Sequence, residues 1–253
     1  MDKYLYSTQI QNMQITQPEI LKTLEDAQLA YEAGDFVNAL QFYEYFFDHA
    51  LDNDPYALYG VRLSYCLDGW AKLGQVFPGA QKRLEQKQIE LLNEYQETKN
   101  GETFHDYFCI CKALNQLNHA LDMFSNLYKN NSKSAEKLAK YVWDDLIKAE
   151  QWELCGQLLS QPEQKIDELF AVYDEAQKLK QFEPEFDNDK FDQHLLNTLL
   201  NGVTDTVQIL RFNNRAKEIS KLERQFYQAV DSRNNASLTK TVHAKASYLF
   251  IGH

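Results

Sequence analysis

The chain has 253 residues, of which 44% are hydrophobic and 25% charged, a balance typical of a folded globular protein rather than a disordered one. Only 9 Gly and 5 Pro occur, too few for the many tight turns of a β-sandwich or barrel, and the abundant Leu, Gln, Lys, Glu and Ala favour helix. A formal net charge of −11 repels phosphate backbones, so nucleic acid is not an expected partner. The composition therefore predicts an all-α protein.

The cellular location is predicted from what the sequence lacks. Residues 1–16 hold no basic segment followed by an apolar run, so no secretory signal is expected. No stretch of about 18 apolar residues occurs, so no membrane span and no membrane partner are expected. The four cysteines form no CxxC pair, which favours reduced, buried thiols in a cytoplasmic protein. They are Cys66, Cys109, Cys111 and Cys155.

Residues 17–51 predict a pair of antiparallel helices. Pro18 and Glu19 are typical of a first helical turn, and apolar residues recur at helical spacing after them. Gly34 predicts the end of the first helix, because glycine adopts the left-handed C-cap conformation without a Cβ penalty. Asp35 can cap the second helix. One apolar face is predicted there, made of Phe36, Ala39, Leu40, Tyr43, Phe47 and Ala50.

Four residues of this pair carry a resemblance to a known family. Gly34, Phe36, Ala39 and Tyr43 stand at the spacing of the tetratricopeptide-repeat signature, in which glycine is followed by an aromatic, a small residue and an aromatic. Over residues 17–160 the chain resembles a divergent member or structural relative of that superfamily. The resemblance implies an α-solenoid of stacked antiparallel helix pairs, whose concave face binds a peptide or a protein.

The same search for periodicity places three further helix-to-helix turns. They fall at Gly74-Gln75-Val76, Asn115-Gln116-Leu117 and Glu150-Gln151-Trp152. In the second unit Pro78 follows the turn closely, so a long helix is predicted to start there and to run to about Thr98.

The expected organisation is a lead-in over residues 1–16, helical repeats over 17–180 and a C-terminal helical cap over 190–253. The boundary is predicted within residues 181–192, which hold a proline, five acids and little helical periodicity. That stretch is either a solvated acidic loop or a binding motif. Apolar stripes after it predict a helix pair that closes the stack or dimerises. The stripes are Phe191, Leu195, Leu199 and Val203, and then Ile219, Leu222, Phe226 and Val230.

No residue set amounts to a catalytic site, since the chain lacks GxSxG, a Gly-rich phosphate loop and HExxH. His105 and Cys109 lie four residues apart and could share a metal ion on one helix face. Cys111, however, would point about 200° away from Cys109 around the helix. We expect no cofactor, no metal and no enzymatic activity here. A metal- or thiol-dependent enzyme centred on His105 and Cys109 is the alternative.

The predicted function is therefore protein recognition, by an adaptor or regulator that binds a peptide or protein. An immunity or antitoxin role, in which the acidic chain neutralises a basic toxin, is the alternative within binding. Lys133, Lys137 and Lys140 form a one-sided basic stripe, which is either a solvated helix face or a site for an anionic ligand or acidic peptide. The resemblance implies a concave lining made of Gln28, Tyr31, Glu32, Ser64, Asp68, Lys72, His105, Cys109, Lys112, Lys137, Lys140, Asp144 and Lys148.

Overall fold

The structure is a computed structural model, and it describes residues 17–233, 236–246 and 249–250. Every regular element in these ranges is helical and none is a strand, which confirms the all-α prediction. Within the same ranges no helix is both long and apolar enough to span a membrane. The predictions for residues 1–16, and part of those for the C-terminal tail, lie outside the described residues.

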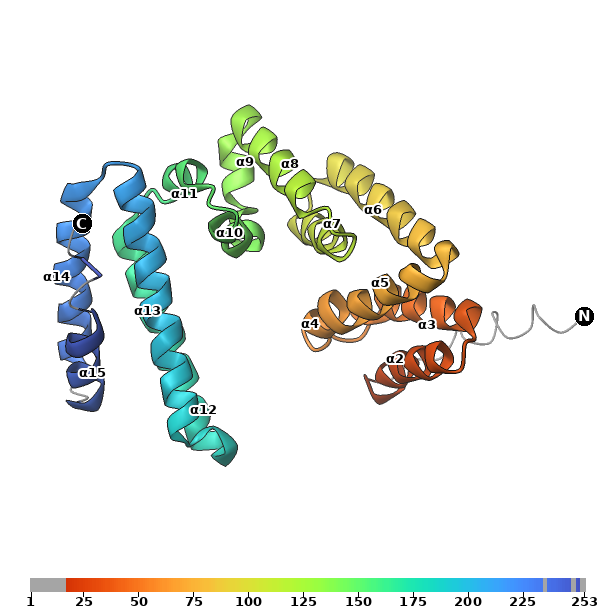
Figure 1. The fold of residues 1–253 in the computed structure, drawn as a ribbon, viewed down its shortest axis with the longest axis horizontal. Helices are drawn as coiled ribbons and strands as arrows, with labels where there is room; N and C mark the ends of the chain where they lie inside the picture. Colours follow the sequence, from red (N-terminus) through yellow and green to blue (C-terminus); the bar gives the residue numbers. More distant parts are fainter. Residues whose placement is uncertain (1–16, 234–235, 247–248, 251–253) are drawn as a thin grey trace, which may run out of the picture. The chain divides into compact units, whose positions relative to one another are not determined.

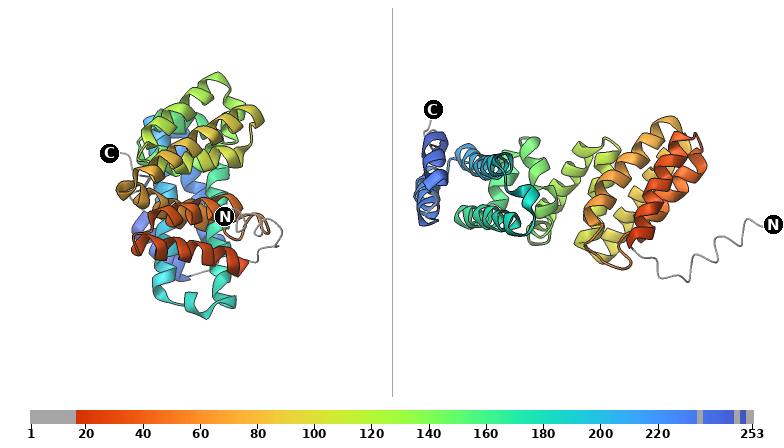
Figure 2. Two further views of the ribbon diagram at one scale, coloured as in Figure 1. Left: turned by 90° about the vertical axis from the view of Figure 1, so that its right-hand side faces the viewer. Right: turned by 90° about the horizontal axis from the view of Figure 1, so that it is seen from below.

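The chain divides into two compact units, Met1–Tyr141 and Val142–His253. The limits predicted from the sequence, 17–180 and 190–253, stay a prediction. In the first unit each helix packs mainly against the next one along the chain, and Figures 1 and 2 show α2 beside α3. Its elements are α2 (Gln17–Glu32), α3 (Phe36–His49), α4 (Tyr59–Val61), the π-helical turn η2 (Arg62–Cys66), α5 (Leu67–Val76), α6 (Pro78–Thr98), α7 (Gly101–Ala113), α8 (Leu117–Asn130) and α9 (Ser132–Glu136). Helix α10 (Ala139–Lys148) crosses the limit between the units.

The second unit is built around α13 (Asp189–Phe212). This helix contacts α11 (Trp152–Leu158), α12 (Pro162–Phe182) and α14 (Ala216–Ser232), and α12 also contacts α14. Figures 1 and 2 show α12 and α13 lying alongside each other. The connection between these two helices includes the short η3 (Pro184–Phe186), and α15 (Ala236–Ala246) packs on α14. The predicted C-terminal helix pair is therefore present as α13 and α14.

Four turns between helices share one local geometry. Gly34 has a φ of 77°, its N–H donates to the carbonyl of Tyr31, and the N–H of Asp35 donates to the carbonyl of Ala30. This is the Schellman arrangement, which satisfies the last carbonyls of the preceding helix. The same pattern of bonds recurs with a positive φ at Asn115, Glu150 and Asn214. The turns predicted at Gly34, Asn115 and Glu150 are thus confirmed, and the one at Asn214 was not predicted.

The turn predicted at Gly74-Gln75-Val76 is wrong in position. Helix α5 continues to Val76, and the chain turns at Phe77, whose backbone is extended with φ −128° and ψ 97°. Pro78 imposes this, because proline disfavours the helical conformation for the residue before it. Gly74 is buried, and a Cβ there would lie 3.2 Å from the backbone of Gln81 in α6. The glycine serves close helix packing, whereas α6 starts at Pro78 and ends at Thr98 as predicted.

Candidate functional site

Three half-buried rings of the first unit, each from a different helix, stack into what we call the aromatic column: Tyr59, His105 and Tyr141. The His105 and Tyr141 ring centroids are 4.4 Å apart at an interplanar angle of 20°. Tyr59 lies on His105 with centroids 5.6 Å apart at 33°. The ammonium group of the exposed Lys140 lies 4.5 Å from the centroid of the Tyr141 ring, a cation–π contact. The column thus joins α4, α7 and α10 and carries a positive charge beside one ring.

Glu102 ties the two phenols of the column together. The Tyr141 hydroxyl donates to Oε1 of Glu102 at 2.6 Å, and the Tyr59 hydroxyl donates to Oε2. The carboxylate stands in the first turn of α7, which Asn100 caps by accepting from the Glu102 N–H at 2.8 Å. Partial burial works to raise the pKa of Glu102, but the two phenol hydrogen bonds, with Lys140 and His105, hold the pKa below its ordinary value. Glu102 is therefore an anion at neutral pH.

The hydrogen bond of His105 assigns its tautomer. Its Nδ1 lies 2.6 Å from the Tyr59 hydroxyl oxygen, whose proton is already donated to Glu102. Nδ1–H must then donate to Tyr59, which leaves the lone pair on Nε2. Burial lowers the pKa of His105, against the opposing effect of the nearby Asp106 and Glu102 carboxylates. The imidazole is neutral at neutral pH and is held in one orientation.

A buried ion pair lies behind the column. Both terminal nitrogens of Arg62 donate to the carboxylate of Asp106 at 2.6 Å, and its Nε donates to the carbonyl of Phe47 at 2.6 Å. The guanidinium also lies 4.0 Å above the centroid of the Phe47 ring. Arg62 and Asp106 are only 7% and 9% exposed. Asp106 follows His105 in α7, and Arg62 lies one turn after Tyr59. The ion pair therefore holds the helical stretch that carries Tyr59 against the helix that carries His105.

Arg62 opens a π-helical turn within one continuous helical stretch, α4–η2–α5. A π-turn inserts one residue relative to an α-helix and so rotates the side chains that follow it. Cys66, at the end of the turn, is buried against α3 and its thiol donates to the carbonyl of Tyr43. Because of this rotation, Arg62 contacts Asp106 in α7, whereas Cys66 contacts Tyr43 in α3.

The structure brings together only some residues of the predicted concave lining. His105 and Lys140 meet through Tyr141 in the aromatic column. His105, Cys109 and Lys112 lie along the one strip of α7 that is partly exposed, whereas most of that helix is buried. The lining as a set stays a prediction. Its exposed members are Gln28, Glu32, Ser64, Asp68, Lys72, Lys112, Lys137, Lys140, Asp144 and Lys148, and its half-buried members are Tyr31, His105 and Cys109.

The chemistry of the cysteines is that of buried thiols. Cys66, Cys111 and Cys155 are buried, and burial raises the pKa of Cys155 to about 11. Cys109 is half-buried, and all four are free thiols. Within the described ranges no three His, Cys, Asp or Glu side chains gather as metal ligands would. An enzyme centred on His105 and Cys109 stays a prediction.

Sequence reasoning missed Tyr59, Glu102 and Tyr141. Tyr59 and Tyr141 lie 43 and 39 residues from Glu102. The hydrophobic periodicity of a single helix does not relate residues at such distances, and a tyrosine in an amphipathic helix is usually core. The only local signal was the capping of α7, in which Asn100 precedes an acid in the first turn.

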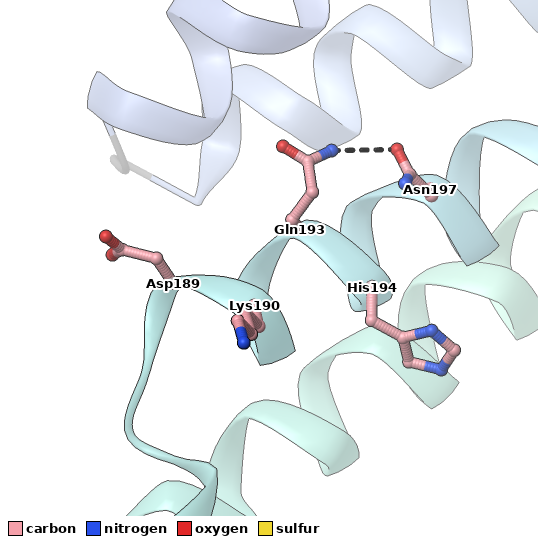
Figure 3. A pocket seen from close by; sticks show the side chains of 5 residues that line it. All are labelled: Asp189, Lys190, Gln193, His194 and Asn197. Atoms are coloured by element: carbon pink, nitrogen blue, oxygen red, sulfur yellow. Dashed lines mark hydrogen bonds between the residues drawn. The ribbon is translucent and has the colours of Figure 1, made fainter.

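The second unit has an open hollow over the first turns of α13, shown in Figure 3. It is lined by Asp189, Lys190, Gln193, His194 and Asn197, all of which are exposed. Gln193 donates to Asn197 at 2.8 Å, and His194 points to another side of the helix (Figure 3). These side chains come from one helix and do not converge on a point, so the hollow is a weaker candidate than the aromatic column.

Comparison of the chain with protein-family models, with curated proteins and with solved structures finds no match. The tetratricopeptide-repeat resemblance therefore depends on the residues from Gly34 to Tyr43 and on the recurring turn.

Proposed function

We propose that this protein is a non-enzymatic recognition protein that binds a peptide or a folded protein, with the aromatic column as part of the binding surface. One observation carries the proposal: the rings of Tyr59, His105 and Tyr141 are partly exposed and yet fixed by stacking and by hydrogen bonds to Glu102. Tyrosine offers a large contact area with few rotatable bonds, so a fixed tyrosine loses little entropy on binding. Pre-organisation of this kind favours recognition.

Two exposed tyrosines close to Tyr59 in the sequence, one in the turn before α4 and one in η2, extend this surface. Tyr56 is 85% exposed, and its carbonyl accepts from the N–H of Tyr59, which places it one turn before the column. Tyr65, in η2, is 74% exposed. Large aromatic side chains left in water are enriched where a partner will cover them. We therefore include Tyr56 in the binding surface and regard Tyr65 as a candidate extension of it.

The finer architectural proposal is a tetratricopeptide-like stack, with the partly exposed strip of α7 as its lining. The recurring turn at Gly34, Asn115 and Glu150 and the mainly sequential helix contacts of the first unit support it. In such a stack the helix before each turn lines the binding face, and α7 is the helix before the turn at Asn115. His105, Cys109 and Lys112 would then face the partner.

An antitoxin-type role is the second candidate. It is favoured by the charge of residues 163–192, which carry ten carboxylates against four lysines in a chain whose net charge is −11. An acidic surface of this kind accelerates association with a basic protein and orients it. Rescue of growth on co-expression with a basic toxin would support this role, and its absence would leave the adaptor role.

Quantitative affinity capture tests the recognition function. The test variant combines Tyr56→Ala with Lys140→Glu, since both side chains are exposed and their replacement should leave the melting temperature unchanged. We expect at least a tenfold loss of a stoichiometric partner that the unmodified chain recovers. The matched control is Ile89→Ala, a 58% exposed apolar residue on α6, which should recover the partner fully. Equal recovery by the test variant would contradict a binding surface that includes Tyr56 and Lys140 beside the aromatic column.

A further inference from the structure

Helix α12 leaves one long face uncovered, which we call the outer stripe: Glu168, Val172, Glu175, Leu179 and Phe182. Their spacing of four, three, four and three residues places them on one side of the helix, in the register of a coiled-coil seam. All five are exposed, Val172 by 62%, Leu179 by 43% and Phe182 by 75%. The stripe spans fifteen residues, and its two ends lie about 21 Å apart along the helix.

The opposite face of α12 already has its partners. Ile166, Phe170 and Tyr173 are buried, and the ring centroid of Phe170 lies 5.7 Å from that of Phe226 in α14. The packing of α12 within its own unit therefore does not need the outer stripe. Three large, exposed apolar side chains on one helix face, with Glu175 between two of them, mark a place where another surface docks.

The charges in and around the outer stripe define what can dock. Glu175 pairs with Lys178 at 2.6 Å and Glu168 with Lys165 at 3.6 Å, but such exposed pairs contribute only about 0–1 kcal/mol each. A partner's cation can therefore replace either lysine at little cost. Beyond the end of the stripe, Glu183, Glu185 and Asp189 make no ion pair within the described residues. The rim is negative and open to a basic partner.

We propose that the outer stripe docks a basic amphipathic helix of another protein. The apolar side chains of that helix would cover Val172, Leu179 and Phe182, and its lysines or arginines would meet the glutamates and the acidic rim. A second copy of this chain fits poorly. A parallel pairing of two stripes sets each glutamate against itself, and an antiparallel pairing centred on Glu175 sets Glu175 against Glu175. The inference stands apart from the aromatic column, because it uses no residue of the first unit.

A designed peptide pair tests this on the full-length protein. One probe is a helical peptide of about 18 residues with Leu at the heptad seam and Lys at the flanking positions, and the other carries Glu in place of Lys. Fluorescence anisotropy should detect the basic peptide alone, with an affinity that weakens at least tenfold between 50 and 500 mM salt, on the order expected when several charges are screened. The variant Leu179→Ser with Phe182→Ser should weaken binding at least tenfold. The matched control, Ile89→Ser, should leave it unchanged.

A charge-reversal variant completes the test. Glu168→Lys with Glu175→Lys should weaken binding of the basic peptide and bring binding of the acidic one. Equal affinity for both peptides, or basic-peptide binding that Leu179→Ser with Phe182→Ser does not change, would overturn the proposal. Dimerisation of the chain that the same double variant abolishes would also overturn it, because a second copy would then occupy the stripe. Tyr56→Ala with Lys140→Glu should bind the peptide normally, which separates this test from that of the aromatic column.

Discussion

The two units use the same turn between helices and yet pack differently. In the first unit helices mainly contact their neighbours in sequence, whereas α12, α13 and α14 of the second unit all contact one another. Helix length does not explain the difference, since α6 with 21 residues is nearly as long as α13 with 24. The width of the apolar surface separates these two helices. Four residues of α6 are buried along one stripe, but nine of α13 are buried, including the adjacent pairs Leu195-Leu196 and Leu199-Leu200. A wider apolar face needs more neighbours to cover it.

Breaking the buried ion pair of the first unit should have the largest effect. Arg62→Ala leaves the Asp106 carboxylate buried without its partner, which should lower the free energy of unfolding by about 3–5 kcal/mol. Hydrogen exchange should show the loss of protection in residues 17–141. The matched control is Arg233→Ala in the second unit, where the pair with Asp174 is half-buried and the expected cost is about 1 kcal/mol. Equal losses from the two variants would contradict the contrast between the units.

Changes at the shared turn should have smaller and opposite effects. Gly34→Ala forces a Cβ into a left-handed conformation and should destabilise the chain by about 1–2 kcal/mol.

Glu150 holds a φ of 53°, so Glu150→Gly relieves that strain, against an entropic cost of about 0.5–1 kcal/mol. A net gain below about 1 kcal/mol is expected from denaturant unfolding. Destabilisation by Glu150→Gly would mean that the Glu150 side chain stabilises the folded state by more than its left-handed backbone conformation costs.

The smallest effect expected is the pH dependence of the aromatic column. The pKa of His105 is lower in the folded chain than in the unfolded one, so the unfolded state binds the proton more tightly. The stability from the neutral imidazole is complete above the unfolded pKa of about 6.5 and is lost as the pH falls below it. The melting temperature should fall between pH 7.5 and 5.5. His105→Phe should flatten that slope, and His119→Phe, at an exposed position, should not.

Below this pH range, the loss of stability reflects the protonation of Glu102 instead. Its pKa is lowered in the folded chain, so its contribution is present above the unfolded pKa of about 4.3 and is lost as the pH falls through the folded value. Tyr141→Phe removes one of the two hydrogen bonds that lower this pKa. The variant should therefore reduce the loss of stability below pH 4, as followed by circular dichroism.

What the sequence could predict was local. Gly34 and Pro78 impose backbone conformations by their own chemistry, so the end of one helix and the start of another were readable. Gly74 was misread because glycine also serves close packing, and the distinction depends on Gln81 across the interface. Asn214 is a permitted left-handed residue between two polar neighbours, Asn213 and Arg215, but the repeat resemblance extends only over residues 17–160 and so placed no turn there.

The candidate site could not be predicted because it is long-range. Arginine is seldom buried, and nothing near Arg62 in the sequence indicates that Asp106 will pair with it. The column likewise depends on Glu102 accepting from two tyrosines that lie 43 and 39 residues away. The family resemblance did place His105 and Lys140 in one set, although it gave no reason why Tyr141 would join them.

The single inserted residue of the π-turn constrains how this chain can change by insertion or deletion. On one side of η2, Arg62 reaches Asp106, and on the other the Trp70 indole donates to the carbonyl of Ala80 at 3.0 Å. Deleting one residue between them would restore an ordinary α-helix and turn one end by about 100° relative to the other. A shortened chain could keep either the Arg62–Asp106 ion pair or the hydrogen bond from Trp70 to Ala80, but not both. Insertions and deletions at this point should therefore be far less tolerated than in the neighbouring connections.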